Sequence, residues 1–297
     1  MTSQSSSPGS ITAVVVLYKR APSASETLCS LKEILRADSI LASHLSLIIY
    51  DNSPESHDSD LAVDIPVLYK HDPTNAGLAA AYNFALDCAD QARHEWLLLL
   101  DQDTSLTPEF FAELIACTLL LRDRTEVASI VPKLLVGGKI FSPGAHFIDQ
   151  LRRPYRRTNH AVSHDENGIQ QGRLGAYNSG ATFRVSRLIS VGGFPKEFWL
   201  DYLDHAVFHT LSIHGYQMYV MKTELNHDSS QSKMGDVPVW RQRNILQAQT
   251  LFVKRTGNYL DRLFYRVWLL RYSRSLRINH PDKRLWKEAF LQALRLK

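Results

Sequence analysis

Short apolar runs alternate with stretches of helical periodicity over the first 120 residues of this chain. Short, unbroken apolar runs are typical of strands that are buried on both faces of a sheet. Such strands are predicted at residues 11–18, 45–50, 67–69 and 96–101. The helical stretches between them indicate the order β-α-β-β-α-β-α. That order predicts an α/β fold with a mostly parallel sheet flanked by helices.

The pattern changes after residue 120, where further strands precede a region dominated by helices. Strands are predicted at 127–132, 139–141, 174–185 and 216–221. Helices are predicted at 186–192, 204–214, 239–256, 259–273 and 281–296. The polar stretch 151–172 is expected to be a long loop, and its length and polarity make it the candidate for a lid.

Length and composition place the chain among ordinary globular proteins. It has 297 residues, of which 44% are hydrophobic and 22% charged, and this suits one large α/β domain or a domain with an appendage. No run of about 18 consecutive apolar residues is present, so no transmembrane helix is predicted. The first ten residues are polar and lack the apolar segment of a signal peptide, so a disordered leader is expected there.

The three cysteines, Cys29, Cys88 and Cys117, are far apart and lie in stretches with apolar periodicity. None of them belongs to a Cys-x-x-Cys motif, which would indicate a metal or redox site. We therefore expect buried free thiols in a reducing cytoplasm.

Charge is distributed unevenly along the chain. The net charge is +4, but residues 254–297 contain twelve Lys or Arg and three Asp or Glu, which makes +9 for this segment and −5 for the rest. Between residues 259 and 273, arginines alternate with apolar and aromatic residues. This favours an amphipathic, cationic helix at an anionic membrane surface; the alternative is a helix that packs on the main domain. Nucleic acid is not favoured as a partner, because no known nucleic-acid-binding motif is present.

The first candidate for chemistry is the end of the predicted strand 96–101, where Asp101 and Asp103 stand one residue apart. Ligands of open α/β sheets bind at the carboxyl ends of the strands. Two neighbouring carboxylates repel each other unless a cation lies between them, and Mg²⁺ or Mn²⁺ bound with a substrate diphosphate would fit. The alternative is a solvated pair in a turn.

Two further loops follow predicted strands at the same edge. Asp51 ends the second strand, and its carboxylate could accept the N3–H group of a uracil or thymine ring, or else form an Asx-turn. Asn75 and Gly77 open a predicted helix, whose free N–H groups would suit a phosphate or a sugar. A plain helix cap is the alternative there.

Six motifs follow one another in the chain: VVVLYKR at 14–20, IIYDNSP at 48–54, NAGLAAAYN at 75–83, LLLLDQD at 97–103, NSGATFRVSRLISVGGFPKEFWLDYLD at 178–204 and RQRN at 241–244. Together they resemble the GT-A, family-2 inverting glycosyltransferases, in particular the rhamnosyltransferase-like branch, over roughly residues 11–257. The resemblance implies a GT-A fold, which is Rossmann-like, with a C-terminal helical extension. The regions expected are the leader at 1–10, a catalytic domain at 11–236 and a basic helical region at 237–297.

The resemblance implies an enzyme, a hexosyltransferase that moves a sugar to a hydroxyl of a bacterial surface glycan such as a lipopolysaccharide O-antigen. dTDP-L-rhamnose is the favoured donor, and UDP-hexose and UDP-galactofuranose are the alternatives. Mg²⁺ or Mn²⁺ would assist the departure of the diphosphate. The implied location is the cytoplasm, peripherally at the inner face of the membrane, with a glycan or lipid-linked glycan as acceptor. A non-catalytic glycan-binding relative is the other class, and a nucleotidyltransferase is disfavoured because residues 17–22 contain no glycine.

By resemblance, the donor site draws on five of the motifs, with the residues Val16, Tyr18, Asp51, Asn75, Gly77, Asp101, Gln102 and Arg243. The metal site is implied at Asp101, Asp103 and His227. In such enzymes the second aspartate of the pair binds the metal, whereas the first reaches the ribose or the sugar of the donor.

An inverting transfer needs one base that takes the proton of the acceptor hydroxyl. The resemblance places this base at Asp204, ahead of Asp201, and a helix start there favours the ionised carboxylate. Ala206 stands where relatives usually carry an acidic residue, which changes the expected shape of the acceptor site. His205 and His209 are four residues apart and could bind a metal, but surface or packing roles are favoured.

Two further pairs of residues in the motifs could contact the substrates. Trp199 and Tyr202 could stack on a sugar ring or belong to the core. Arg241 and Arg243 lie at a predicted helix start, and an arginine fork suits a diphosphate. Arg243 is preferred, because with Asn244 it matches the Arg-Asn pair of the family.

Overall fold

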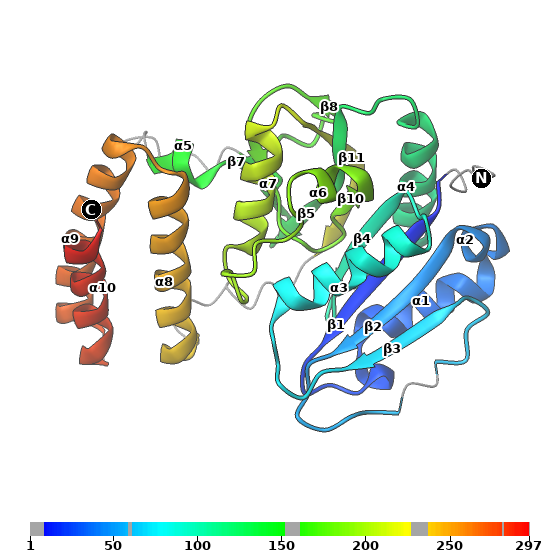
Figure 1. Ribbon diagram of the computed structural model, residues 1–297, viewed down its shortest axis with the longest axis horizontal. Helices are drawn as coiled ribbons and strands as arrows, with labels where there is room; N and C mark the ends of the chain where they lie inside the picture. Colours follow the sequence, from blue (N-terminus) through cyan, green and yellow to red (C-terminus); the bar gives the residue numbers. More distant parts are fainter. Residues whose placement is uncertain (1–8, 59–60, 152–160, 227–236, 281, 297) are drawn as a thin grey trace.

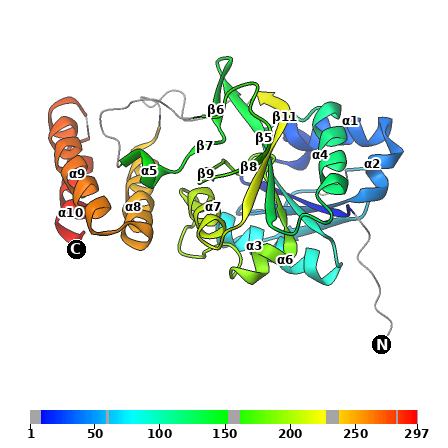
Figure 2. The same cartoon turned by 90° about the horizontal axis from the view of Figure 1, so that it is seen from above.

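The computed structural model describes residues 9–58, 61–151, 161–226, 237–280 and 282–296 (Figure 1). A large sheet forms the centre of the molecule, and helices cover both of its faces (Figures 1 and 2). Residues 1–8 of the expected leader lie outside the described part. Ser10 is part of the fold, because it is buried and its carbonyl accepts the backbone amide of Trp96.

The first half of the sheet is parallel. Its strands are β1 (Ile11–Leu17), β2 (Leu45–Asp51), β3 (Val67–His71) and β4 (Trp96–Asp101), in the order β3-β2-β1-β4. The register places Leu17 of β1 opposite Asp51 and Val16 opposite Asp101. The two aspartates therefore lie at the same edge of the sheet, on either side of β1.

The second half of the sheet is mixed. Its strands are β5 (Val127–Val136), β6 (Lys139–Ser142), β8 (Gly168–Gln170), β10 (Thr182–Arg184) and β11 (Gln217–Asn226). β10 lies antiparallel between β4 and β5, and β11 runs parallel to β5. A small second sheet pairs β7 (Gly144–Ala145) with β9 (Leu174–Gly175).

The helices are α1 (Glu26–Ala37), α2 (Ser39–His44), α3 (Leu78–Gln91), α4 (Pro108–Leu120), α5 (Phe147–Leu151), α6 (Val185–Ser190), α7 (Leu203–Ile213), α8 (Val239–Thr256), α9 (Tyr259–Asn279) and α10 (Lys283–Arg295). The last three form a group at one end of the molecule (Figure 1). None of the described helices combines the length and the apolar character that crossing a bilayer requires.

Alternate residues of the central strands pack into two different cores. Val14 and Leu99 pack with α3, α6 and α7 on one face, whereas Val15 and Leu100 pack with α1 and α4 on the other. Because both faces are covered, the strands are apolar at consecutive positions. The α/β fold class, with its GT-A-like sheet and C-terminal helices, is thus as predicted.

One predicted strand is wrong. Residues 174–185 form two short strands, β9 and β10, with a turn between them in which the amide of Ala181 donates to the carbonyl of Asn178. Gly180 makes this turn possible, because its φ is +75° and a Cβ atom there would lie 2.9 Å from the Pro132 side chain. The apolar residues on both sides of the turn concealed it in the sequence.

Other boundaries and burial predictions also differ in part. α8 has the predicted bounds, whereas α9 continues to Asn279. The predicted loop 151–172 ends in β8, and because residues 152–160 lie outside the described part, its role as a lid stays a prediction. All three cysteines are free, but only Cys117 is buried. Cys88 is half-buried and Cys29 is exposed, since Leu28 and Leu31 take the core face of α1.

Candidate active site

The turn after β4 carries Asp101, Gln102 and Asp103 at the carboxyl edge of the sheet. This edge is a switch point, because β2 lies on one side of β1 and β4 on the other. The side-chain oxygen of Gln102 accepts the amide of Tyr18 at 3.0 Å, and its carbonyl accepts the hydroxyl of Ser25 at 2.8 Å. These bonds anchor the turn to its neighbours, and Asp103 is exposed.

Asp51 is completely buried at the end of β2. Its Oδ1 accepts the amide of Ser53 at 2.9 Å, and its Oδ2 accepts the hydroxyl of Tyr69 and Nδ1 of His57, each at 2.7 Å. Burial raises the pKa of Asp51, but the hydrogen bonds from Ser53, Tyr69 and His57 outweigh it and lower the pKa overall. The described structure thus contains the Asx-turn, and binding of a base there would have to displace one of these donors.

The loop before α3 is held against the segment that precedes α7. Nε1 of Trp199 donates to the carbonyl of Asn75 at 2.9 Å, and the amide of Leu78 donates to the carbonyl of Trp199 at 2.8 Å. Gly77 has φ +90°, and a Cβ atom there would lie 2.3 Å from the Trp199 ring. The glycine is therefore required by this contact, and the Trp199 ring stays 39% exposed beside the site.

Asn83, the last residue of the NAGLAAAYN motif, fastens α3 to the turn after α6. Its Nδ2 donates to the carbonyl of Phe194 at 2.8 Å, and its Oδ1 accepts the amide of Phe194 at 2.9 Å. A Cβ atom on Gly193 would lie 2.5 Å from this oxygen. The sequence analysis assigned no role to Asn83, although its place in a motif was a signal.

Asp204 lies in the first turn of α7 and is 9% exposed. Its Oδ1 accepts the backbone amide of His205 at 2.7 Å, which orients the carboxylate. The role of Asp204 as the base stays a prediction.

The charges that act on Tyr82 include those of two candidate site residues. It is completely buried on α3, and its hydroxyl has no hydrogen-bond partner within the described residues. Burial raises the pKa of Tyr82 well above its usual value, and the charges of Asp101 and Asp204 raise it further. Both carboxylates thus lie near one phenol. No local signal in the sequence marks Tyr82 as a site residue, because a tyrosine in an alanine-rich helix has the pattern of a core residue.

Asp201 has a different environment from Asp204. Its side chain is 8% exposed, and its Oδ1 lies 4.0 Å from Nη2 of Arg241. Burial raises its pKa to about 6, with a further increase from the charge of Asp204 that Arg241 opposes. Near neutral pH a fraction of Asp201 therefore carries a proton.

Arg243 points away from Asp201. Its Nη2 lies 3.8 Å from Oε2 of Glu288 on α10, whereas Arg241 faces Asp201. Arg241 is therefore the arginine next to Asp201. The binding of a donor by Arg243 stays a prediction.

His205 and His209 pack in an aromatic cluster. The rings of His209 and His146 lie 5.6 Å apart, and the His205 ring lies 4.8 Å from that of Tyr202. Burial lowers the pKa of His146 to about 3 and lowers that of His209 as well, so both rings are neutral at pH 7. Over the described ranges, no group of three His, Cys, Asp or Glu is placed to hold a metal ion. The packing role predicted for these histidines fits this geometry.

The donor set at the end of β4 fits a divalent cation. Asp101 and Asp103 would supply carboxylate oxygens, which Mg²⁺ and Mn²⁺ prefer. Magnesium sites at substrate phosphates take only one or two carboxylates from the protein. His227, the third predicted ligand, lies outside the described residues.

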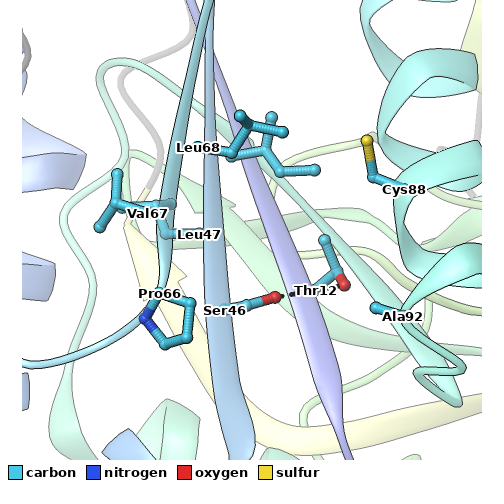
Figure 3. Close-up of a pocket in the computed structure, with 9 residues that line it drawn as sticks. Thr12, Ser46, Leu47, Pro66, Val67, Leu68, Cys88 and Ala92 are labelled. Atoms are coloured by element: carbon cyan, nitrogen blue, oxygen red, sulfur yellow. Dashed lines mark hydrogen bonds between the residues drawn. The ribbon is translucent and has the colours of Figure 1, made fainter.

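A small hollow lies at the other end of the strands (Figure 3). Thr12, Ser46, Val67 and Cys88 are among the residues that line it, and its volume is about 180 Å³. Thr12 and Ser46 lie near the amino ends of β1 and β2, away from Asp51 and Asp101. Ligand pockets usually measure about 300–1,000 Å³, so this hollow is a poor candidate for a nucleotide site.

Comparison with known proteins gives a family and a fold. The model of the family described as "Glycosyl transferase family 2" matches residues 12–180, which is more than half of the chain. No curated protein matches the chain. Among solved structures, S. aureus TarS is similar to 96% of this chain and 49% of its own, with 15% sequence identity and a TM-score of 0.57. This chain thus spans about half the length of that TarS chain.

Two further solved structures are similar over nearly the whole chain. S. aureus TarS 1-349 in complex with UDP matches 97% of this chain and 80% of its own, with 14% identity and a TM-score of 0.56. GalNAc-T7 with UDP, GalNAc and Mn²⁺ matches 96% and 56%, with 12% identity and a TM-score of 0.56. At such identities the likeness shows the fold alone, and it confirms the GT-A arrangement.

Proposed function

The chain belongs to glycosyl transferase family 2, and from that premise we propose that it moves L-rhamnose from dTDP-L-rhamnose to a hydroxyl of a bacterial surface glycan, with inversion. One observation carries the proposal: Asp101 ends β4 at the carboxyl edge of the sheet, and the buried Asp204 lies in the first turn of α7, which packs with α3 on one face of that sheet. A single displacement needs one group that holds the leaving diphosphate and one base for the acceptor, and these two carboxylate positions supply both.

Asp204 is the base in this proposal. It takes the proton of the acceptor hydroxyl while the new glycosidic bond forms, and the amide of His205 orients its carboxylate. Asp201 faces Arg241, and its raised pKa leaves a fraction of its carboxyl groups protonated near neutral pH. We therefore keep Asp201 as the second candidate for the base.

Asp101 and Asp103 hold the cation and, through it, the donor diphosphate. When bound, Mg²⁺ or Mn²⁺ neutralises the charge that develops on the leaving group. Tyr18 and Gln102 shape the turn through their mutual hydrogen bond, and Val16 lies opposite Asp101 in the register. The UDP and Mn²⁺ in the similar GalNAc-T7 structure support this type of site.

A UDP-sugar is the second candidate donor. The similar TarS structures were determined with UDP and with UDP-GlcNAc. UDP-hexose and UDP-galactofuranose would leave the roles of Asp101, Asp103 and Asp204 unchanged, since only the base and the sugar differ.

A panel of nucleotide sugars tests both candidates. The melting temperature is measured with Mn²⁺ and each donor, and nucleoside-diphosphate release is then measured with a lipid-linked glycan as acceptor. We expect dTDP-L-rhamnose to raise the melting temperature most and to be turned over. A larger shift in melting temperature with a UDP-sugar would identify that sugar nucleotide as the donor. No release of nucleoside diphosphate from any donor would favour a non-catalytic glycan-binding protein.

We further propose that the acceptor is a lipid-linked glycan, met at the inner face of the cytoplasmic membrane. The +9 charge of residues 254–297 supports such a location, because the cytoplasmic leaflet is negative. Fractionation of cells tests it: the protein is expected with the membranes at low salt and in the supernatant at high salt.

A further inference from the structure

Helix α9 carries apolar side chains on the face that points away from the protein. Tyr265, Leu269 and Leu276 are buried and fasten the helix to its neighbours. Its other apolar side chains include Leu260, Leu263, Phe264 and Val267, which are between 40% and 56% exposed. An exposed apolar patch is unfavourable in water, which indicates that another surface covers these side chains.

These side chains form one continuous stripe. Positions that are three or four residues apart share one face of a helix. The same face continues through Arg271, Arg274 and the exposed Ile278. We name this set the α9 stripe; its members are Leu260, Leu263, Phe264, Val267, Arg271, Arg274 and Ile278. Its first half is apolar, and its second half is mainly cationic.

We propose that the α9 stripe binds an anionic phospholipid bilayer. The apolar half enters the boundary between headgroups and acyl chains, and Arg271 and Arg274 contact the headgroup phosphates. Binding through the α9 stripe gives the membrane location of the proposed function a specific surface, and the purpose of this binding rests on that function. The surface itself follows from the side chains of α9 alone.

The positive charge of this region favours a bilayer, and not a second copy of the chain, as the occupant of the α9 stripe. Residues 254–297 carry +9. Two α9 stripes packed in parallel would bring Arg271 and Arg274 of both copies together, and packed antiparallel they would bury these arginines against apolar side chains. An anionic leaflet offers negative charge and an apolar interior side by side.

The position of α9 suits this role. α8 to α10 lie at one end of the molecule, and α9 and α10 are its outermost helices (Figures 1 and 2). α8 connects this end with the site, because its Arg241 lies 4.0 Å from Asp201. A bilayer on α9 would therefore lie on the Asp201 side of the site, where a lipid-linked acceptor is needed.

Co-sedimentation with vesicles tests the proposal. The full chain is mixed with vesicles of phosphatidylcholine alone, or of equal parts phosphatidylcholine and phosphatidylglycerol. We expect binding to the anionic vesicles only, and weaker binding as salt is added. Neither donor nor acceptor is present, so a failure of the proposed reaction does not affect this result.

Two double variants locate the contact. Arg271→Gln with Arg274→Gln should weaken binding roughly thirtyfold, and Phe264→Gln with Val267→Gln at least about tenfold. Arg122→Gln and Ile40→Gln serve as controls, because both residues are exposed and belong to α2 or follow α4, which lie away from α9 in the molecule (Figure 1). Unchanged melting temperatures show that the variants are folded.

Three results would overturn the proposal. They are equal binding to both kinds of vesicle, binding that survives both α9 double variants, and a stable dimer without vesicles that the Phe264→Gln, Val267→Gln variant dissociates. The last result, measured by sedimentation, would identify a second copy as the occupant of the α9 stripe.

Discussion

Asp201 and Asp204 are neighbouring carboxylates with different surroundings. Asp201 is buried against Arg241, and its pKa is raised to about 6. Asp204 stands at the start of α7 and accepts the amide of His205. Pairs of acids with different environments are a frequent feature of active sites, so each residue deserves its own measurement.

Asp204→Asn should lower the transfer rate by about 10²–10⁴-fold, because the amide cannot take the acceptor proton. The shift in melting temperature that the donor causes should stay the same, since Asp204 does not hold the donor. Asp201→Asn, an isosteric change three residues away, is the control. If Asp201→Asn instead loses the larger factor, the base is Asp201.

Asp201 should also make stability depend on pH. Its folded pKa of about 6 lies above the ordinary 3.8, so the folded state holds this proton more tightly. That stabilising contribution is complete below about pH 4 and is lost as the pH rises through about 6. The Asp201→Asn variant has no such proton to lose. Its free energy of unfolding relative to that of the wild type should therefore increase between about pH 4 and about pH 7, by up to about 3 kcal/mol.

Urea denaturation at both pH values measures this difference. Asp87→Asn, at an exposed aspartate of α3, provides the control. A constant difference between Asp201→Asn and the wild type would show that burial does not perturb Asp201.

At the scale of elements, the loop before α3 depends on one glycine. Gly77 has φ +90° and touches Trp199. Gly77→Ala should cost about 3 kcal/mol or more, from backbone strain together with the clash. Gly192→Ala is the matched control, because Gly192 has the same φ of +90° but no atom within 4 Å of an added Cβ.

Denaturation midpoints of the two variants separate the effects. Gly192→Ala reports strain alone, so the additional loss in Gly77→Ala measures the contact with Trp199. Equal losses would mean that the loop moves away from Trp199 without cost.

Most elements were predictable because their periodicity is local. The runs at 11–18 and 96–101 became β1 and β4, since alternate residues fill two cores. The turn within 174–185 was missed although Ser179-Gly180 is a turn signal, and its close contact with Pro132 of β5 is visible only in the structure.

At the scale of the whole molecule, metal and donor binding should be linked. A chelator should abolish transfer and the stabilisation by the donor, because the diphosphate is held through the cation. The melting temperature of the protein without donor should barely change, since both cores are built without the cation. Thermal melts with and without chelator measure both, and Asp103→Asn should reproduce the effect of the chelator.

The sequence by itself determined the order of the main strands of the parallel half, the α/β class and the edge at which Asp51 and Asp101 lie. Each of these follows from spacing within one segment or from the direction of parallel strands. Only the tertiary structure decided which side chains meet. It placed His57 and Tyr69 on Asp51, and Arg241 rather than Arg243 beside Asp201. Such contacts depend on strand register and helix phase between distant segments, which local periodicity does not encode.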